Sequence, residues 1–139
     1  MLFRSDLALV RRTASFANVL KLNAAEAARL ADGSNETPGR EEAHARQLAQ
    51  QLNLPTICIT AGARGAGLLR NGQWTWEVGR PVVVVDTVGS GDAFLAAFLA
   101  GLMRGSHSDA ALLASACRLG EWVASRSGAT PDYDATTPV

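Results

Sequence analysis

Apolar residues recur along the chain with a helical period in some stretches and as short unbroken runs in others. The helical period predicts helices, and the short runs rich in β-branched residues predict buried strands. The predicted helices span residues 6–14, 24–31, 40–52, 91–105 and 108–128. The predicted strands span residues 18–23, 55–60 and 80–86, and residues 67–78 predict a hairpin.

Turn and cap residues support several of these boundaries. Asn71-Gly72 lies inside the hairpin stretch, and this pair accepts the positive φ angles that a tight turn requires. Ser108 is expected to cap the start of the last helix, and Gly128 its end. The valine run within residues 80–86 is continuously apolar and β-branched, as an interior strand should be.

The order of these elements is strand, helix, helix, strand, hairpin, strand, helix, helix, which is typical of an α/β fold. With 139 residues the chain suits one domain with a substantial core. A short helix leads into the first strand without a ligand-binding loop before it. The pattern therefore suits the later part of a larger sheet.

Composition narrows the classes of partner. Thirteen basic and thirteen acidic side chains cancel, so no net field favours nucleic acid. No apolar stretch reaches the length of a membrane span, and we expect a cytoplasmic protein. Cys58 and Cys117 are expected to be buried free thiols, whereas the isolated His44 and His107 are expected at the surface.

A glycine turn joins the last predicted strand to the helix after it. Gly89, Ser90 and Gly91 allow successive backbone N–H groups to converge, and the helix adds its positive dipole end. Such a turn can hold a phosphate, and Asp92 beside it can take a proton from an attacking hydroxyl. The alternative is a plain tight turn in which Asp92 caps the helix.

Two common phosphate-binding patterns do not fit this turn. The Walker pattern ends in Gly-Lys-Ser or Gly-Lys-Thr, and Lys21 is the only lysine of the chain. The dinucleotide pattern requires a glycine at the position of Phe94.

Polar and small residues follow two of the predicted strands. Asn23 and Glu26 predict a helix-capping box, with a metal-bound phosphate as the alternative partner. Thr60, Gly62 and Gly65 form either an ordinary connection or bare backbone that a nucleotide can approach.

The last helix carries small residues on one stripe. Cys117, Gly120 and Ala124 either admit a flat adenine or let a neighbouring helix pack closely. Close packing is the simpler interpretation of this stripe taken alone.

Four segments, in order, resemble the signatures of the PfkB carbohydrate kinases of the ribokinase-like superfamily. "DTVGSGD" resembles the family's Asp-Thr-x-Gly-Ala-Gly-Asp signature, and "KLNAAEA" resembles its Lys-x-Asn-x-x-Glu segment. "ITAGARGAG" resembles its Thr-x-Gly-x-x-Gly nucleotide segment, and "ASRSGATP" is similar to the loop that closes its nucleotide and monovalent-cation site. The resemblance covers Asn18 to about Pro131. It implies the ribokinase-like three-layer α/β/α sandwich, with residues 1–139 as the C-terminal half of the sheet and its flanking helices.

The resemblance also implies a role for each residue of the glycine turn. Asp92 would be the catalytic base that takes the proton of a sugar hydroxyl. The backbone N–H groups of Gly89, Ser90 and Gly91 would form the anion hole for the transferred phosphoryl group. Ser90 replaces the commoner alanine of the signature but keeps its backbone donor.

Ligands for ATP and two metal ions are implied in the same way. The ATP phosphates and ribose would contact Thr60, Gly62 and Gly65, and the adenine would contact Cys117 and Gly120. Mg²⁺ would be oriented, through water, by Asn23 and Glu26. A potassium ion would lie beneath the anion hole, held by Asp86 and the backbone carbonyls of Val88 and Gly128.

The implied activity is that of an ATP-dependent sugar kinase of the fructokinase or ribokinase type, with ATP and a small sugar as its partners. Family members are roughly twice as long, and the half with the lid and most sugar-binding residues would precede residue 1. We therefore expect these residues alone to phosphorylate no sugar, and the complete enzyme to be able to form a homodimer. A nucleoside or vitamin-precursor kinase of the same fold, and a non-catalytic nucleotide-binding fragment, remain as alternatives.

Overall fold

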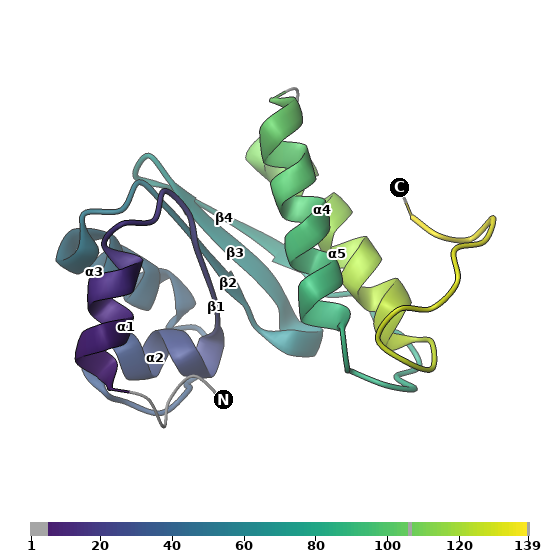
Figure 1. Cartoon of the computed structure of the whole chain (residues 1–139), viewed down its shortest axis with the longest axis horizontal. Coiled ribbons are helices and arrows are strands. Elements are labelled where there is room, and N and C mark those ends of the chain that lie inside the picture. The colour runs from purple at the N-terminus through teal and green to yellow at the C-terminus, as the bar shows by residue number, and fades with distance from the viewer. Residues whose placement is uncertain (1–5, 106, 139) are drawn as a thin grey trace. The chain divides into compact units, whose positions relative to one another are not determined.

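A computed structural model describes residues 6–105 and 107–138 of the chain. The strands are β1 (Leu20–Asn23), β2 (Thr56–Thr60), β3 (Gly65–Arg70) and β4 (Gln73–Val78), and they form one sheet in the order β1-β2-β3-β4 (Figure 1). The helices are α1 (Leu7–Ala14), α2 (Ala24–Asp32), α3 (Glu41–Leu52), α4 (Ser90–Arg104) and α5 (Asp109–Ala124), with a 3₁₀ turn η2 at Gly62–Arg64. The predicted α/β class is confirmed.

Contacts divide the chain into two compact units. The first unit comprises Met1–Ala61 with Gly67–Thr75, and the second comprises Gly62–Ala66 with Trp76–Val139. The β3–β4 hairpin contributes residues to both units.

In the first unit, α2 and α3 pack on the parallel pair β1 and β2. The register of the two strands runs from Leu20 opposite Ile57 to Asn23 opposite Thr60, so their carboxyl ends are level. The inner side of α3 carries Ala45, Leu48 and Leu52 as predicted, and all three are buried. This face and the apolar side chains of β2 form the core of the unit.

His44 does not lie at the surface as predicted. Its side chain is buried on α3, and its Nε2 atom lies 3.6 Å from the Asp32 carboxylate at the end of α2. The reason is helical geometry, because position 44 lies one turn before Leu48 and so falls on the inner stripe of the helix. His107 is exposed, as predicted.

The predicted hairpin is confirmed. Asn71 and Gly72 join β3 to β4 with φ angles of 49° and 83°, the positive values that this pair favours. The Asn71 N–H donates to the Pro55 carbonyl at 3.0 Å, which holds the end of β3 beside the start of β2.

In the second unit, α4 and α5 lie side by side (Figure 1). Phe94 and Phe98 of α4 stack at 6.1 Å between ring centroids, and Leu112 and Leu113 of α5 are buried with them. Gly101 lets the Leu112 side chain approach α4 closely, because a Cβ at this position would require the end of that side chain to shift. The burial of these apolar side chains accounts for the pairing of the two helices.

The prediction of an interior strand at residues 80–86 is wrong. These residues form no strand, and Val83 is 83% exposed. The backbone of this segment is tied instead to the end of α5, where the N–H groups of Val85 and Asp86 donate to the Ala124 carbonyl at 2.9 and 3.2 Å. A β-branched run favours extended backbone, but a strand also needs a neighbouring strand, and none of the described residues supplies one here.

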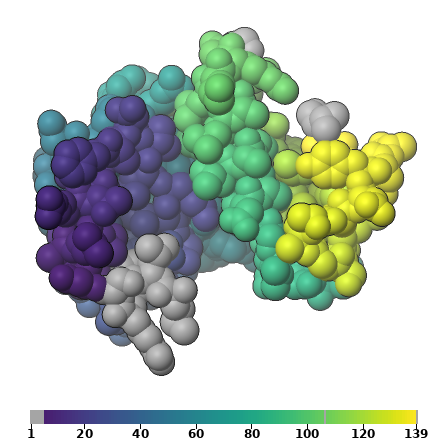
Figure 2. All heavy atoms as spheres, viewed as in Figure 1, coloured from purple at the N-terminus to yellow at the C-terminus, as the bar shows by residue number. Residues whose placement is uncertain are grey.

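The end of α5 also differs from the prediction. The helix ends at Ala124 with Ser125 as its C-cap, so Gly128 is not the cap. Gly128 has the predicted positive φ of 86°, but it uses this angle in the loop that follows. That loop and the tail after it are irregular, and their surface, yellow in Figure 2, is largely exposed.

Two further predictions concern the cysteines and membrane-spanning segments. Cys58 and Cys117 are buried and are not joined in a disulfide, as predicted. Over the ranges that the structure describes, no helix is long and apolar enough to span a membrane.

Candidate active site

The start of α4 is a glycine turn with unused backbone donors. Gly89 is the N-cap residue, with a φ of 83° and no side-chain cap bond. The Ser90 N–H donates to the Thr87 carbonyl at 3.3 Å, and the Ser90 hydroxyl donates to the same oxygen at 2.9 Å. Within the described part of the chain, the N–H groups of Gly89, Gly91 and Asp92 have no acceptor. The helix start therefore presents donors and the positive end of the helix dipole to an anion.

Asp92 lies in the first turn of α4 and is exposed. Its carboxylate accepts no hydrogen bond from any described residue, so it does not cap the helix. The structure therefore lacks the Asp92 side-chain cap that the plain-turn alternative expects. The structure leaves an uncommitted carboxylate beside uncommitted N–H donors.

The Asp86 carboxylate accepts hydrogen bonds from the backbone of the turn and of the loop after α5. Its Oδ1 atom accepts the Val88 N–H at 2.9 Å, and its Oδ2 atom accepts the Gly128 N–H at 3.3 Å. These bonds bring Asp86, Val88 and Gly128 together, which are the residues expected around a monovalent cation. In the structure the carboxylate joins the turn before α4 to the loop after α5.

Gly89 is required by a close approach of that loop. A Cβ on Gly89 would lie 2.5 Å from the Ala129 carbonyl oxygen and 2.8 Å from its Cα. Real Cβ atoms do not make such contacts, so only glycine fits this position. The backbone of Ala129 is therefore packed directly on the turn.

A second set of predicted residues lies at the carboxyl ends of β1 and β2, in the first unit. Asn23 and Thr60 are opposite each other in the register. Asn23 Oδ1 accepts the Glu26 N–H at 2.8 Å, and Glu26 Oε2 accepts the Asn23 N–H at 3.0 Å, so the predicted capping box is confirmed. Ligands of open α/β sheets bind at this edge of the strands. The edge thus carries one amide and one carboxylate, both engaged in the capping box, and the Thr60 hydroxyl, which donates to the Leu22 carbonyl at 3.4 Å.

The two glycines after β2 differ in their surroundings. Gly62 has a φ of 57°, is exposed, and has open space where a Cβ would lie. Gly65 is buried, and a Cβ there would collide with the carbonyl oxygen of Glu77 in β4. Packing within the hairpin therefore explains Gly65, whereas Gly62 is accessible to a ligand.

Cys117 and Gly120 lie on the buried side of α5. A Cβ on Gly120 would lie 3.1 Å from the Ser90 carbonyl oxygen and 3.5 Å from the Phe94 Cβ, so this glycine lets α5 approach the start of α4. Burial raises the pKa of the Cys117 thiol to about 12, with a further contribution from Glu121. The thiol is therefore a neutral, apolar group at physiological pH.

The predicted residues are divided between the two units. Those of the first unit are Asn23, Glu26 and Thr60, and those of the second are Gly62, Gly65, Asp86, Val88, Gly89, Ser90, Gly91, Asp92, Cys117, Gly120 and Gly128. The described residues contain no cluster of three or more His, Cys, Asp or Glu side chains that could hold a metal ion. Sequence reasoning gave no role to Ala129, nor to the residues that support its loop.

A helix start with free N–H donors beside a free carboxylate can hold an anion and accept a proton at the same place. The chain matches the pfkB family carbohydrate kinase over residues 4–136, and it belongs to this family. The predicted family and its ribokinase-like fold are thereby confirmed.

Among curated relatives, aminoimidazole riboside kinase of Salmonella typhimurium is 37% identical over 109 residues, which cover 78% of this chain and 32% of that protein. Fructokinase of Vibrio alginolyticus is 30% identical over 102 residues, which cover 73% of this chain and 31% of that protein. Among solved structures, a double mutant of Vibrio cholerae O395 fructokinase bound to fructose, ADP and potassium ion has a TM-score of 0.73 and 26% identity, with 88% of this chain and 39% of that chain covered. The matched part of this chain spans about a third of the length of these curated relatives.

Proposed function

We propose that this chain carries the nucleotide-binding and catalytic part of an ATP-dependent kinase that phosphorylates a hydroxyl group of a small sugar. The observation that carries the proposal is the pairing of Asp92 with the free N–H donors at the start of α4. The kinase names of the matched relatives support the reaction class.

The reaction requires one proton transfer and one phosphoryl transfer. Asp92 takes the proton of the sugar hydroxyl, whose oxygen attacks the γ-phosphorus as the bond to the β-phosphate oxygen breaks. Negative charge on the transferred group is met by the anion hole at Gly89, Ser90 and Gly91. The N–H groups of Gly89 and Gly91 are available, whereas the Ser90 N–H must leave the Thr87 carbonyl to take part. One such donor is worth about 3 kcal/mol in the transition state.

The remaining residues would bind and orient ATP. We assign the phosphates and ribose to Thr60, Gly62 and Gly65, and the adenine to a position beside Cys117 and Gly120, both of which are buried in this structure. Asn23 and Glu26 would hold the waters around Mg²⁺, which when bound neutralises phosphate charge. Asp86 and the carbonyls of Val88 and Gly128 would hold a potassium ion, an assignment supported by the potassium-bound fructokinase.

A riboside kinase is the second candidate. The aminoimidazole riboside kinase is more similar to this chain than the fructokinase, at 37% against 30% identity. A panel of fructose, ribose and ribosides, tested with the chain in its complete kinase domain, separates the two candidates. The 139 residues alone are expected to phosphorylate none of them, because they match only about a third of the relatives' length.

Asp92→Ala tests the proposal in the complete kinase domain. Loss of the base should lower kcat by at least about 100-fold, with the affinity for ATP unchanged within about twofold. Asp132→Asn is the matched control, because Asp132 is also an exposed carboxylate of the second unit and should leave kcat unchanged. Turnover by Asp92→Ala near the wild-type rate would contradict the proposal.

A further inference from the structure

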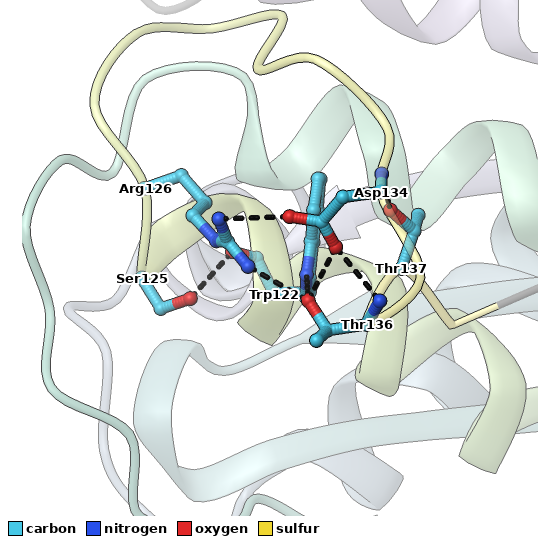
Figure 3. A network of polar contacts seen from close by, with 6 residues as sticks. All are labelled: Trp122, Ser125, Arg126, Asp134, Thr136 and Thr137. Carbon is cyan, nitrogen blue, oxygen red and sulfur yellow. Dashed lines mark hydrogen bonds and ion pairs between the residues drawn. The ribbon is translucent and has the colours of Figure 1, made fainter.

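The segment that follows α5 turns back toward this helix and is held there by side-chain contacts (Figure 3). The Trp122 indole of α5 is the anchor. Its Nε1–H donates to the Thr136 hydroxyl at 3.2 Å, and its ring meets the Tyr133 ring edge to face at 5.9 Å. The Arg126 guanidinium lies 4.7 Å from the centre of the indole ring, within the range of a cation–π contact.

Arg126 lies at the start of this returning segment and Asp134 lies near its end, and their side chains form an ion pair. Arg126 Nη1 lies 3.2 Å from Asp134 Oδ2, and Arg126 Nη2 donates to the Thr136 hydroxyl at 2.8 Å (Figure 3). Thr136 completes the network by donating its hydroxyl hydrogen to Asp134 Oδ1 at 2.5 Å. The Thr136 hydroxyl thus accepts two hydrogen bonds and donates one, which is its full capacity.

The segment between these two ends contacts the glycine turn. The Gly128 N–H donates to Asp86, and the Ala129 backbone lies against Gly89, where a Cβ would not fit. Through these contacts, the position of the loop determines the position of the turn at the start of α4. Interfaces packed this closely transmit a shift of one element to its neighbour.

We propose that Arg126, with Asp134 and Thr136, positions the anion hole by holding the loop after α5 against the Gly89 turn. This inference rests on the proposed function of that turn. Arg126 is a positioning residue, because it acts through Gly128 and Ala129. The lowered pKa of Asp134, caused mainly by its hydrogen bonds with Thr136, agrees with a carboxylate that stays ionised in this network.

Amide hydrogen exchange of the 139-residue chain, without nucleotide, tests the support that the network gives to the turn. In Arg126→Ala we expect the Val88 and Gly128 amides, both bonded to Asp86, to exchange about tenfold faster, with central α5 amides unchanged. Arg126→Lys keeps a charge for Asp134 but loses the planar fork, so its effect should be intermediate. Asp134→Asn should also accelerate exchange at Val88 and Gly128, because it removes the charge partner of Arg126. Asp132→Asn, in the same exposed segment, is its control and should leave the exchange unchanged.

Two results would overturn the inference that the Arg126 network supports the turn. One is unchanged exchange at Val88 and Gly128 in Arg126→Ala, and the other is equal acceleration throughout α5, which would mark a general loss of stability. Because this measurement uses no substrate, it is independent of the kinase proposal and of the Asp92→Ala result.

The catalytic consequence is measured in the complete kinase domain. Arg126→Ala should lower kcat about tenfold while the KM for the sugar stays within about twofold, because the anion hole acts mainly in the transition state. An unchanged kcat in a variant with accelerated exchange would overturn the positioning role.

Discussion

Replacing Gly89 by alanine tests the close approach on which the turn depends. Gly89 has a φ of 83°, and a Cβ there would meet three atoms of Ala129 at 2.5 to 2.9 Å, two of them backbone. Gly105 offers a matched control, because it also has a positive φ, 68°, but has open space around its Cβ position. The two glycines lie at opposite ends of α4.

The expected cost separates into two parts. A positive φ costs alanine about 1 kcal/mol at either glycine. At Gly89 the Ala129 backbone must also move, and overpacking of this kind costs about 1–3 kcal/mol. We therefore expect Gly89→Ala to lower the free energy of unfolding by about 2–4 kcal/mol, and Gly105→Ala by about 1 kcal/mol.

Urea unfolding followed by circular dichroism measures both variants under the same conditions. The comparison isolates the contact with Ala129, because both variants share the backbone strain. Equal losses of stability in the two variants would refute the close approach and, with it, the route by which the loop holds the turn.

Three further predictions concern single groups. Because the pKa of Cys117 is raised to about 12, iodoacetamide at pH 8 should label Cys117 only after unfolding, as mass spectrometry can show. Asn23→Ala should reduce stability by about 1 kcal/mol in urea unfolding, and Asn23→Asp should retain the cap. The pKa of Asp134 lies below its usual 3.8, so the stabilisation by its ionised carboxylate is present above that pH and is lost on further acidification. The Trp122 Nε1–H resonance should therefore shift only below about pH 4, and Asp134→Asn should abolish this shift.

Local signals in the sequence were sufficient for most helices and for the hairpin. The Asn23 capping box, the Ser108 cap and the Asn71-Gly72 turn each involve residues within a few positions of one another. Their geometry is fixed by short-range hydrogen bonds and backbone angles, which hold in any tertiary context. These elements were therefore predictable without knowledge of the fold.

The failures occur where distant residues decide the outcome. The valine run has a strong strand preference, but its only described backbone bonds go to Ala124, so it lies outside the sheet. The polar sequence neighbours of His44 favour a surface position, whereas the packing of α3 buries it. Gly128 is typical of a helix end, but its N–H donates to Asp86, which is far away in the sequence. The local sequence pattern does not reveal these distant partners.

The residues of the candidate site divide in the same way, into those that local motifs identify and those that depend on contacts between distant residues. Motif order identified the turn at Gly89 and its neighbour Asp92, but sequence alone left open whether Asp92 caps the helix. Only the structure shows that its carboxylate accepts no hydrogen bond from the described residues. The network links Trp122 of α5, and Arg126 just after this helix, to the tail, and no spacing rule relates such positions.

The most direct test of the central claim is a titration of the ¹⁵N-labelled chain with MgATP, followed by amide chemical shifts. If the start of α4 accepts the phosphates, the Gly91 and Asp92 amides should shift progressively, while the Gly105 amide at the far end of the helix should not. An absence of shifts at Gly91 and Asp92 at millimolar MgATP would contradict the account.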